Sequence, residues 1–412
     1  GDPEFEKLKN SIEHFGYVEL IVVNSKNNNT VISGHQRLSV LKHIGQTEVE
    51  CVIVELDTEQ EKALNIAMNK VAGDWDKNKL LLVIADLQGS DFDVSLTGFD
   101  ADELADLFDG KKDIEEDDFD VDKALGSEAF VKKGDVWLLD RHRLFCGDST
   151  NSADVALLMD GKQANLCITD PPYSCNYTGG TGMKIMNDNL KGEEFYNFLH
   201  SAIKNAYNSL ADGATIYIFH SDAEKVNFFN ATVNAGFHYS TTCIWVKNAL
   251  VIGRMDYQMR HEPIIYAFKD TAKHKFYGDR KQTTIWEFDK PTKSKLHPTT
   301  KPLPLIAYPM KNSSQVNGIV LDLFGGSGSI LITAEQLDRT AYLMELDPRY
   351  ASAIVRRYAA CRGGVDDVFV IRNGEKLPCR DVYIPSDEEL GFKDGSVDDL
   401  QKGRKSGVSV GE

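Results

Sequence analysis

The sequence predicts an α/β protein. Its main domain is expected to be a largely parallel sheet covered by helices on both faces, preceded by a smaller α+β domain. Apolar runs of strand length alternate with segments of helical spacing over residues 131–370, which is typical of a parallel sheet with crossover helices. The 412 residues exceed one ordinary hydrophobic core. A composition of 42% hydrophobic and 26% charged residues indicates a folded chain rather than a disordered one.

The first domain is expected over residues 6–108. Residues 19–23 and 49–54 are apolar, strand-like runs, and a helical pattern over residues 38–45 lies between them. Gly34-His35-Gln36-Arg37 precedes that helix, at a turn where an arginine can bind phosphate. We expect the chain to begin inside this domain, without the domain's first strand.

Acidic residues mark the boundary between the two domains. Residues 100–122 contain 12 Asp and Glu against two lysines, which is a local net charge of −10. Such a run repels itself, so we expect a solvated linker over residues 109–128. After residue 377 the periodicity ends, and the segment 377–412 is expected to be a flexible tail.

The second domain, residues 129–376, alternates strands and helices along the chain. Residues 163–170 are an apolar strand that ends in a Pro-rich turn, and apolar residues at helical spacing follow from Phe195 to Leu210. Three more strands are expected at residues 214–219, 244–246 and 264–268. A strand, a helix and a strand complete the pattern at residues 318–324, 330–337 and 341–344.

A glycine-rich turn follows the strand at residues 318–324. The run from Phe324 to Gly328 leads into a helix, where free N–H groups and missing Cβ atoms let a ligand approach the backbone. Glu345 ends the next strand, where a carboxylate can accept hydrogen bonds from ribose hydroxyls. Leu331 is too bulky for the third small position of the dinucleotide fingerprint, and no Gly-Lys-Ser/Thr follows. These features favour an adenosine-containing ligand without a pyrophosphate over a nicotinamide cofactor.

Asp170-Pro171-Pro172-Tyr173 lies directly after a strand, at the sheet edge where ligand sites of α/β proteins form. The tetrapeptide combines a carboxylate, a rigid turn that points a backbone carbonyl outward, and an aromatic ring. Two acceptors can hold the amino group of a flat base while the base stacks on the ring. The alternative for the tetrapeptide alone is a strand-ending turn with a surface tyrosine.

Several classes of protein are disfavoured. The seven cysteines are scattered, with no Cys-x-x-Cys pair and no His-Glu-x-x-His, so neither a disulfide framework nor a metal site is indicated. No apolar stretch approaches the ~20 residues that cross a bilayer. We therefore expect a cytoplasmic protein with no membrane partner.

The two motifs together resemble the amino-group DNA methyltransferases that use S-adenosylmethionine. In that family Asp-Pro-Pro-Tyr is the catalytic motif and Phe-x-Gly-x-Gly holds the cofactor. Residues 144–149, His261-Glu262-Pro263 and the run from His297 to Pro302 are further matches. The catalytic motif precedes the glycine loop, which is similar to the permuted β class. The resemblance covers more than half of the chain and implies a Rossmann-like methyltransferase sheet.

The resemblance also implies a role for each matching residue. Asp170 and the carbonyl of Pro172, in the turn with Pro171, would bind the target amine, and Tyr173 would stack on the flipped base. Asp322 and the loop residues would hold the methionine part of the cofactor, Glu345 its ribose, Lys301 its carboxylate and Asp148 its adenine. The loop residues are Phe324, Gly325, Gly326 and Gly328. Because the sulfonium already activates the methyl group, positioning is most of what the protein must provide.

The charge distribution is compatible with a DNA substrate. The net charge is −17, but residues 251–300 carry ten Lys and Arg against six Asp and Glu. Phosphate binding needs a basic face rather than a basic protein. The resemblance places the target-recognition region at residues 249–296, with six candidates for DNA contacts: Arg254, Arg260, Lys273, Lys275, Arg280 and Lys281. The alternative for each of them is an ordinary solvated charge.

The first domain resembles the ParB/sulfiredoxin-like domain through Gly34 and Arg37 of its Gly-x-x-Arg box. His35 and Gln36 depart from the usual Gly-Glu-Arg-Arg, which argues against nucleotide hydrolysis and nuclease action. The box contains no cysteine, which argues against sulfiredoxin activity. The resemblance implies either a DNA- or nucleotide-binding accessory or a structural module, in a protein similar to those carried by phages and mobile elements.

The predicted function is a site-specific methyltransferase that flips its target base out of duplex DNA. Asp rather than Ser at position 170 favours adenine N6 over cytosine N4 in the resembled family. Three alternatives stay open: transfer to cytosine N4, a ParB-like partitioning protein that binds DNA without catalysis, and methyl transfer to RNA or protein. A homodimer and a place in a restriction–modification system are compatible with the resemblance.

Overall fold

The chain divides into two units, residues 1–111 and 112–412. The computed structural model describes residues 3–70, 79–80, 83–84, 87, 94–99, 103, 114–175, 186–251, 256–278, 281–289, 301–386 and 389–390. None of the helices within these ranges is long and apolar enough to cross a membrane. Each unit is described below by itself.

The described part of the first unit contains a three-stranded sheet and several helices. β1 (Ile21–Asn24) pairs antiparallel with β2 (Thr30–Ser33) and parallel with β3 (Cys51–Val54). Helices α1 (Pro3–Phe15) and α2 (His35–His43) bury apolar residues against β1. Helix α3 (Thr58–Asn69), which starts at an Asp57 capping box, packs with the short helix η1 (Val94–Thr97). The strands expected at residues 19–23 and 49–54 and the helix expected at 38–45 correspond to β1, β3 and α2, and their ends agree within three residues.

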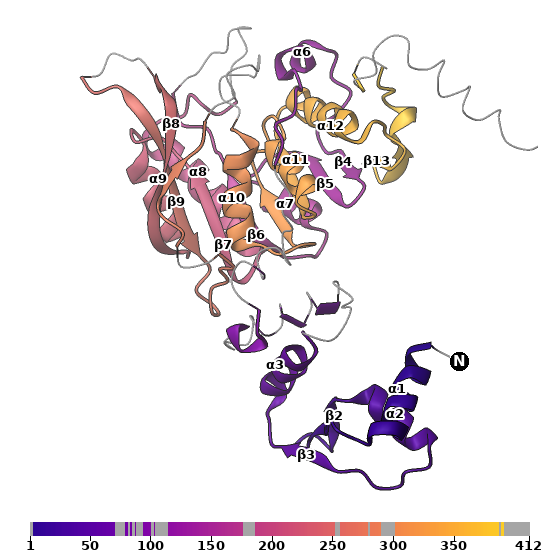
Figure 1. Cartoon of the computed structure of the whole chain (residues 1–412). Helices are drawn as coiled ribbons and strands as arrows, with labels where there is room; N and C mark the ends of the chain where they lie inside the picture. The colour runs from indigo at the N-terminus through magenta and orange to yellow at the C-terminus, as the bar shows by residue number, and fades with distance from the viewer. Residues whose placement is uncertain are drawn as a thin grey trace, which may run out of the picture. The chain divides into compact units, whose positions relative to one another are not determined.

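An eleven-stranded sheet forms the second unit, in the order β10-β8-β9-β7-β6-β11-β12-β5-β4-β13-β14 (Figure 1). Its parallel centre consists of β7 (Leu210–Phe219), β6 (Ala164–Thr169), β11 (Ile319–Asp322), β12 (Thr340–Glu345) and β5 (His142–Cys146). The flanking strands are β8 (His238–Val251), β9 (Met259–Phe268) and β10 (Ile285–Glu287) on one side, and β4 (Val136–Leu139), β13 (Val368–Arg372) and β14 (Glu375–Pro378) on the other. The α/β class is confirmed, but the expectation of a mostly parallel sheet holds for the five central strands and for the edge pair of β10 with β8, whereas the other flanking pairs are antiparallel. Short connections such as that between β8 and β9 force antiparallel pairing at the flanks.

Helices cover both faces of this sheet, as the sequence predicts. One face carries α7 (Ser152–Met159), α8 (Gly192–Ser209) and α9 (Lys225–Asn234), and the other carries α10 (Leu303–Ser313), α11 (Ser329–Gln336) and α12 (Pro348–Arg362) (Figure 1). Successive residues of a strand point to opposite faces, so Ile168 packs with the second group of helices and Cys167 with the first. Burial on both faces explains why β6 is apolar along its whole length.

The order in which the chain adds strands to the sheet reverses between β6 and β11, which are themselves parallel. From β6 the chain moves outward to β7, and from β11 it moves the opposite way to β12. Such a reversal leaves a crevice beyond the carboxyl ends of the two strands. Thr169 Oγ1 donates a hydrogen bond of 2.8 Å to Asp322 Oδ1 and joins these two ends. The segment starting at Asp170 and the glycine loop both leave the sheet here.

The acidic segment, defined here as residues 114–126, packs on the second unit. Glu115 exchanges hydrogen bonds with Gln336, and helix α6 (Val121–Gly126) buries Val121 and Leu125 against α12. The prediction of a solvated linker is wrong for these residues. The apolar side chains spaced between the acids form a cluster with α12, which holds the segment against the second unit.

The start of the expected tail is also folded. Cys379 is fully buried, Tyr383 stacks on Phe130 with ring centroids 4.1 Å apart, and Glu389 pairs with Arg356. The prediction of a flexible tail is therefore wrong for residues 377–386 and 389–390. The other residues of that segment lie outside the described part.

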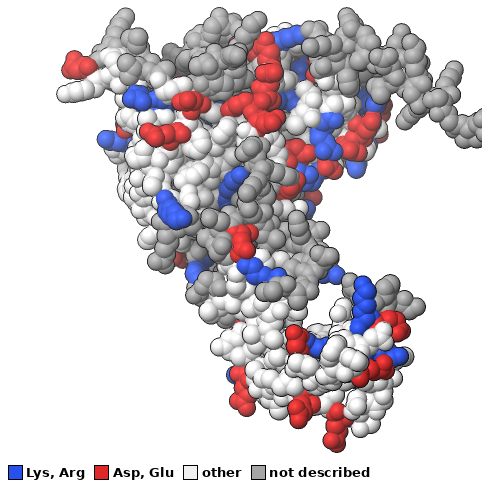
Figure 2. Space-filling view, viewed as in Figure 1, with Lys and Arg blue, Asp and Glu red and all other residues white. Residues whose placement is uncertain are grey.

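Charges of both signs are mixed on the surface. On the face shown in Figure 2, the described Lys and Arg side chains are interspersed with Asp and Glu and are not gathered into one broad patch.

Candidate active site

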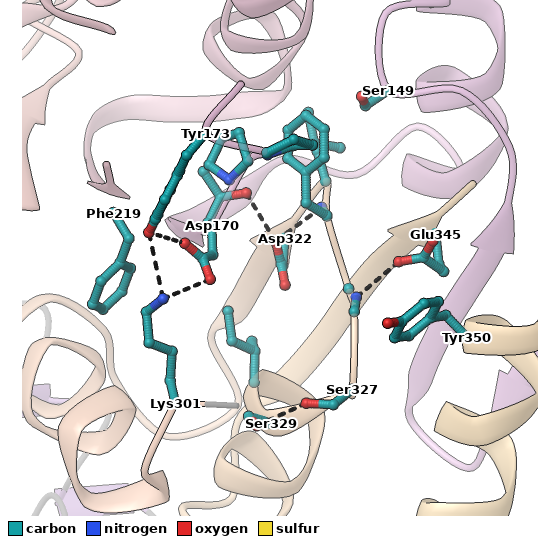
Figure 3. Close-up of a pocket in the computed structure, with 18 of the residues that line it drawn as sticks. Ser149, Asp170, Tyr173, Phe219, Lys301, Asp322, Ser327, Ser329, Glu345 and Tyr350 are labelled. Carbon is teal, nitrogen blue, oxygen red and sulfur yellow. Dashed lines mark hydrogen bonds and ion pairs between the residues drawn. The ribbon is translucent and has the colours of Figure 1, made fainter. Parts of the chain in front are cut away.

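A cavity of about 650 Å³ lies at the reversal point between β6 and β11. Its wall includes residues from the carboxyl ends of five strands and from the loops that follow them. Figure 3 shows that Asp170, Tyr173, Phe219 and Lys301 gather at one end, which we call the amine end. Glu345 and Tyr350 lie at the other end, beyond the glycine loop. A volume of this size suits a small organic ligand.

Asp170 and Tyr173 form the amine end together with the turn of Pro171 and Pro172. The Tyr173 hydroxyl is hydrogen-bonded to Asp170 Oδ1 and lies 2.8 Å from Glu262 Oε1. The tyrosine ring rests edge-on against Phe228, with centroids 6.1 Å apart. Burial raises the pKa of the Asp170 carboxyl, although the neighbouring Lys301 ammonium opposes this shift.

Lys301 and Lys247 supply two ammonium groups to this end. Lys301 Nζ lies 2.7 Å from Asp170 Oδ2 and 2.7 Å from Glu262 Oε1, and Lys247 Nζ lies 2.9 Å from Glu262 Oε2. Burial would raise the pKa of Glu262, but the two ammonium groups outweigh it and lower the pKa to about 2. Burial would likewise lower the pKa of Lys301, but the carboxylates of Asp170 and Glu262 raise it above its usual value.

The position of Lys301 differs from the role that the family resemblance implied. Lys301 was expected beside the carboxylate of the cofactor, whereas its ammonium lies between two protein carboxylates at the amine end. Glu262 was part of a matched motif but had no expected role. Lys247 was not singled out at all, because it comes from a strand whose pairing with β9 the sequence does not show.

The glycine loop runs close to the neighbouring strand. Gly325 N donates to Met344 O at 2.8 Å, and a Cβ on Gly325 would lie only 3.3 Å from that oxygen. Gly326 and Gly328 have φ angles of 52° and 82°, in the left-handed region that favours glycine. These residues therefore keep the loop tight against β12 and its backbone accessible from the cavity.

Two carboxyl groups flank the loop. Asp322 Oδ1 accepts hydrogen bonds from Thr169 Oγ1 and from Phe324 N, and the oxygens of Glu345 accept from Gly326 N and Asp347 N at 2.8 and 2.9 Å. Burial raises the pKa of Asp322 and of Glu345 to about 7 in each case. The ionisation of both groups therefore responds to a ligand that brings positive charge or hydroxyl donors.

The donor set fits the cofactor that the family resemblance implies. Glu345 and Asp322 offer acceptors for hydroxyl and ammonium groups, and the glycine backbone allows close approach. Val121 and Tyr350 line the end near Glu345 and give it apolar and aromatic surface for a flat ring. Neither Val121 nor Tyr350 was expected in the site. Among the described residues, no cluster of three or more His, Cys, Asp or Glu could hold a metal ion.

Asp148 is not brought into this cavity. Its carboxylate accepts from Thr150 N and Thr150 Oγ1 at 2.9 and 2.8 Å and borders a separate hollow, whereas its neighbours Gly147 and Ser149 line the cavity. Asp347 does line the cavity and was missed. A second acid two residues after Glu345 is the signal that could have found it.

The expected DNA-contacting residues do not lie together. Arg260 is on β9 at the cavity end of the sheet, with its Nε donating to Lys247 O at 3.0 Å. Lys273 and Lys275 are exposed beside Gly213, near the start of β7 and at the opposite end of the sheet from Asp170. Lys281 is exposed, and Arg254 and Arg280 lie outside the described residues. Because β9 lies next to β7 within the main sheet, part of the expected recognition region is sheet core.

The box at the start of α2 is a tight turn. Gly34 has a φ of 97°, and a Cβ there would lie 3.1 Å from the Ile21 side chain, so glycine is required by both conformation and space. Arg37 forms an ion pair with Glu19. This pairing partly neutralises the charge that the sequence analysis assigned to phosphate binding.

Three family models match the chain. Residues 164–356 match the DNA methylase model, residues 78–133 the ParB-methyltransferase HTH domain and residues 2–70 the ParB N-terminal domain. The HTH domain was not expected, because our first domain extended to residue 108 and included most of it. Its match also covers the acidic segment that we interpreted as a linker.

Individual proteins are similar to the methylase part. The type II methyltransferase M.HpaI of Haemophilus parainfluenzae is 25% identical over 249 residues, which are 55% of this chain and 77% of that protein. The putative methylase YubD of Escherichia coli (strain K12) is 29% identical over 206 residues, 48% of this chain and 84% of that protein. The crystal structure of an M1.HpyAVI–SAM complex aligns with a TM-score of 0.41 and 23% identity, over 52% of this chain and 98% of that chain.

The match to the DNA methylase model includes the ends of β6 and β11 that meet at the cavity. Asp170, Lys301, Asp322 and Glu345 all lie within the matched residues and line the cavity. A carboxylate–tyrosine amine end and a glycine loop thus share one cavity within the matched residues. The ParB-type matches precede this part in the chain. The chain therefore contains a DNA methylase domain at residues 164–356 and is an S-adenosylmethionine-dependent amino-group DNA methyltransferase with ParB-type domains ahead of that domain.

Proposed function

We propose that the methylase transfers the methyl group to N6 of adenine, with the flipped base held at the amine end of the cavity. The observation that carries this proposal is the shared cavity of Asp170, Tyr173 and the glycine loop at the reversal point between β6 and β11. When bound, S-adenosylmethionine supplies a methyl group already activated by its sulfonium. The residues then have to position the amine and exclude water.

Each residue of the amine end has a proposed role. The Asp170 carboxylate and the Pro172 carbonyl accept the two N–H groups of the amine, so that its lone pair faces the methyl group. The Tyr173 ring stacks on the base. Asp322, Glu345 and the backbone from Phe324 to Gly328 hold the cofactor, with Tyr350 and Val121 against its ring.

The choice of adenine rests on position 170. An aspartate there offers only acceptors when it is ionised, and the resembled family uses serine at this position for cytosine. Cytosine N4 is the second candidate, because its exocyclic amine presents the same two N–H donors. We further propose that the ParB-type domains bind the duplex DNA and that the enzyme works in the cytoplasm.

Methyl transfer to unmethylated duplex DNA from labelled S-adenosylmethionine tests the proposal, with mass spectrometry of the nucleosides. We expect N6-methyladenine from the full chain and at least about a 100-fold lower rate for Asp170→Asn, with cofactor affinity retained. Asp118→Asn, an exposed acid in the acidic segment, is the matched control and should keep the wild-type rate. N4-methylcytosine would overturn the choice of base, and equal rates for wild type and Asp170→Asn would overturn the site.

A further inference from the structure

The Tyr173 hydroxyl lies between two carboxyl groups and cannot donate to both. Its oxygen is within hydrogen-bond distance of Asp170 Oδ1 and of Glu262 Oε1, and a phenol carries one proton. With both carboxyl groups ionised, one of these contacts would place two oxygen atoms together without a proton between them. Lys301 cannot fill that gap, because its nearest approach to the hydroxyl is 3.4 Å and its shorter contacts are to the carboxylates. The geometry therefore requires one additional proton in the cluster.

The surrounding charges decide which carboxyl group holds that proton. Among the described residues, Glu262 contacts two ammonium groups, one at each carboxylate oxygen, whereas Asp170 contacts one, that of Lys301, and shares it with Glu262. The pKa shifts agree with this difference in contacts. Burial raises the pKa of Asp170, whereas Lys301 and Lys247 outweigh burial and lower the pKa of Glu262. Among the described residues, further titratable groups near the cluster include Asp322 on β11, whose pKa burial raises to about 7, and His220 after β7, whose pKa burial lowers.

We propose that Glu262 is a positioning residue which, through Tyr173 and Lys301, keeps a proton on Asp170 while no base is bound. In this state Asp170 donates to the Tyr173 oxygen and Tyr173 donates to Glu262. Asp170 then has no free acceptor at Oδ1 for the target amine. The inference rests on the proposed function and adds to it the control of when Asp170 becomes an acceptor.

Base entry reverses this arrangement. In the proposed base-bound state, the Tyr173 hydroxyl leaves the position between the two carboxyl groups when the ring stacks on the base. Asp170 then loses the partner that its proton was bonded to, ionises to the surrounding water, and keeps Lys301 as its counterion. The enzyme is therefore active only where Asp170 can ionise, so kcat/KM falls at acid pH with the titration of this group.

Removing the charge of Glu262 should make Asp170 ionise more easily. Glu262→Gln keeps an acceptor near Tyr173 and Lys301 but removes the negative charge that favours the protonated form of Asp170. We expect kcat/KM at neutral pH to fall about 10- to 100-fold because Lys301 and Tyr173 are less well fixed. The acid limb of the pH profile should nevertheless move to lower pH. The matched control is Glu375→Gln on the edge strand β14, which should leave both rate and profile unchanged.

Infrared spectroscopy tests the proton itself without any need for turnover. In protein labelled with 13C-aspartate, the wild type minus Asp170→Asn difference spectrum should contain the stretching band of a protonated carboxyl group at a pH where an ordinary aspartate is ionised, and Glu262→Gln should lose this band at a lower pH than the wild type. Cofactor affinity, measured by calorimetry, shows that each variant is folded. An ionised Asp170 in the base-free wild type would overturn the proposal.

The pH profile distinguishes the proposal from a purely structural role of Glu262. A structural role predicts a lower rate with an unmoved acid limb, and that result would also overturn the proposal. If the full chain methylates no DNA, the proposed function fails, whereas the infrared experiment still decides where the proton resides.

Discussion

At the scale of single residues, two buried carboxyl groups make cofactor affinity and stability depend on pH in opposite directions. Burial raises the pKa of Glu345 and of Asp322 to about 7, above the values expected in an unfolded chain. Between the unfolded and the folded pKa the native state binds more protons than the unfolded state. The contribution of these two groups to stability is therefore fully present below the unfolded pKa and is lost as the pH rises through about 7, by about 3 kcal/mol for Glu345. Ribose hydroxyls donate best to the ionised form, so cofactor affinity should rise over the same range.

The Glu345→Gln variant isolates one of the two groups. We expect its unfolding free energy, measured in urea between about pH 5 and pH 8, to fall less with pH than that of the wild type. Of the two buried carboxyl groups, only Asp322 still titrates in this variant. Its cofactor affinity should be lower and less dependent on pH. Glu375→Gln is the control for a general change of charge. Identical pH slopes for wild type and Glu345→Gln would show that Glu345 is ionised in the cofactor-free protein.

At the scale of structural elements, the acidic segment helps to hold the glycine loop in place. Asp117 accepts two hydrogen bonds of 2.6 and 2.7 Å from Arg357, which is 1% exposed and donates through Nη1 to Ser327 O in the loop at 2.9 Å. Glu116 Oε1 accepts from Leu303 N at the start of α10, two residues after Lys301. The segment therefore contacts the elements next to both ends of the cavity.

Asp117→Asn removes the charge partner of a buried arginine. We expect a loss of about 2 kcal/mol in the unfolding free energy, because the buried Arg357 guanidinium loses the carboxylate to which it is directly hydrogen-bonded. Cofactor affinity should fall several-fold because Ser327 is less well fixed. Calorimetry and urea unfolding measure the two effects. Asp118→Asn, exposed and one residue away, should change neither quantity, and an equal loss in both variants would contradict this role.

For the whole molecule, the sequence predicts what is local and misses what depends on distant pairing. The apolar run of β6 and its Pro-rich end place Asp170 correctly, because a strand buried on both faces and a proline turn have local signals. The contact of Lys301 with Glu262 joins residues far apart in the chain, and the ion pair of Glu262 with Lys247 depends on the register of β8 and β9. The acidic segment was misread because its few apolar residues find partners only on α12.

The net charge of −17 makes DNA affinity depend on where individual cations lie. Each phosphate contact adds about one to the slope of log affinity against log salt, so affinity should fall steeply as salt increases.

Arg260 lies at the cavity end of the sheet and Lys275 at the opposite end. We therefore expect Arg260→Gln to weaken duplex binding and to reduce the salt slope by about one, while Lys275→Gln leaves the slope unchanged. Fluorescence anisotropy of a labelled duplex at several salt concentrations measures both. A reduced slope for Lys275→Gln alone would mean that DNA contacts the opposite end of the sheet, away from Asp170, and a flat slope for the wild type would remove residues 249–296 as the DNA-contacting region.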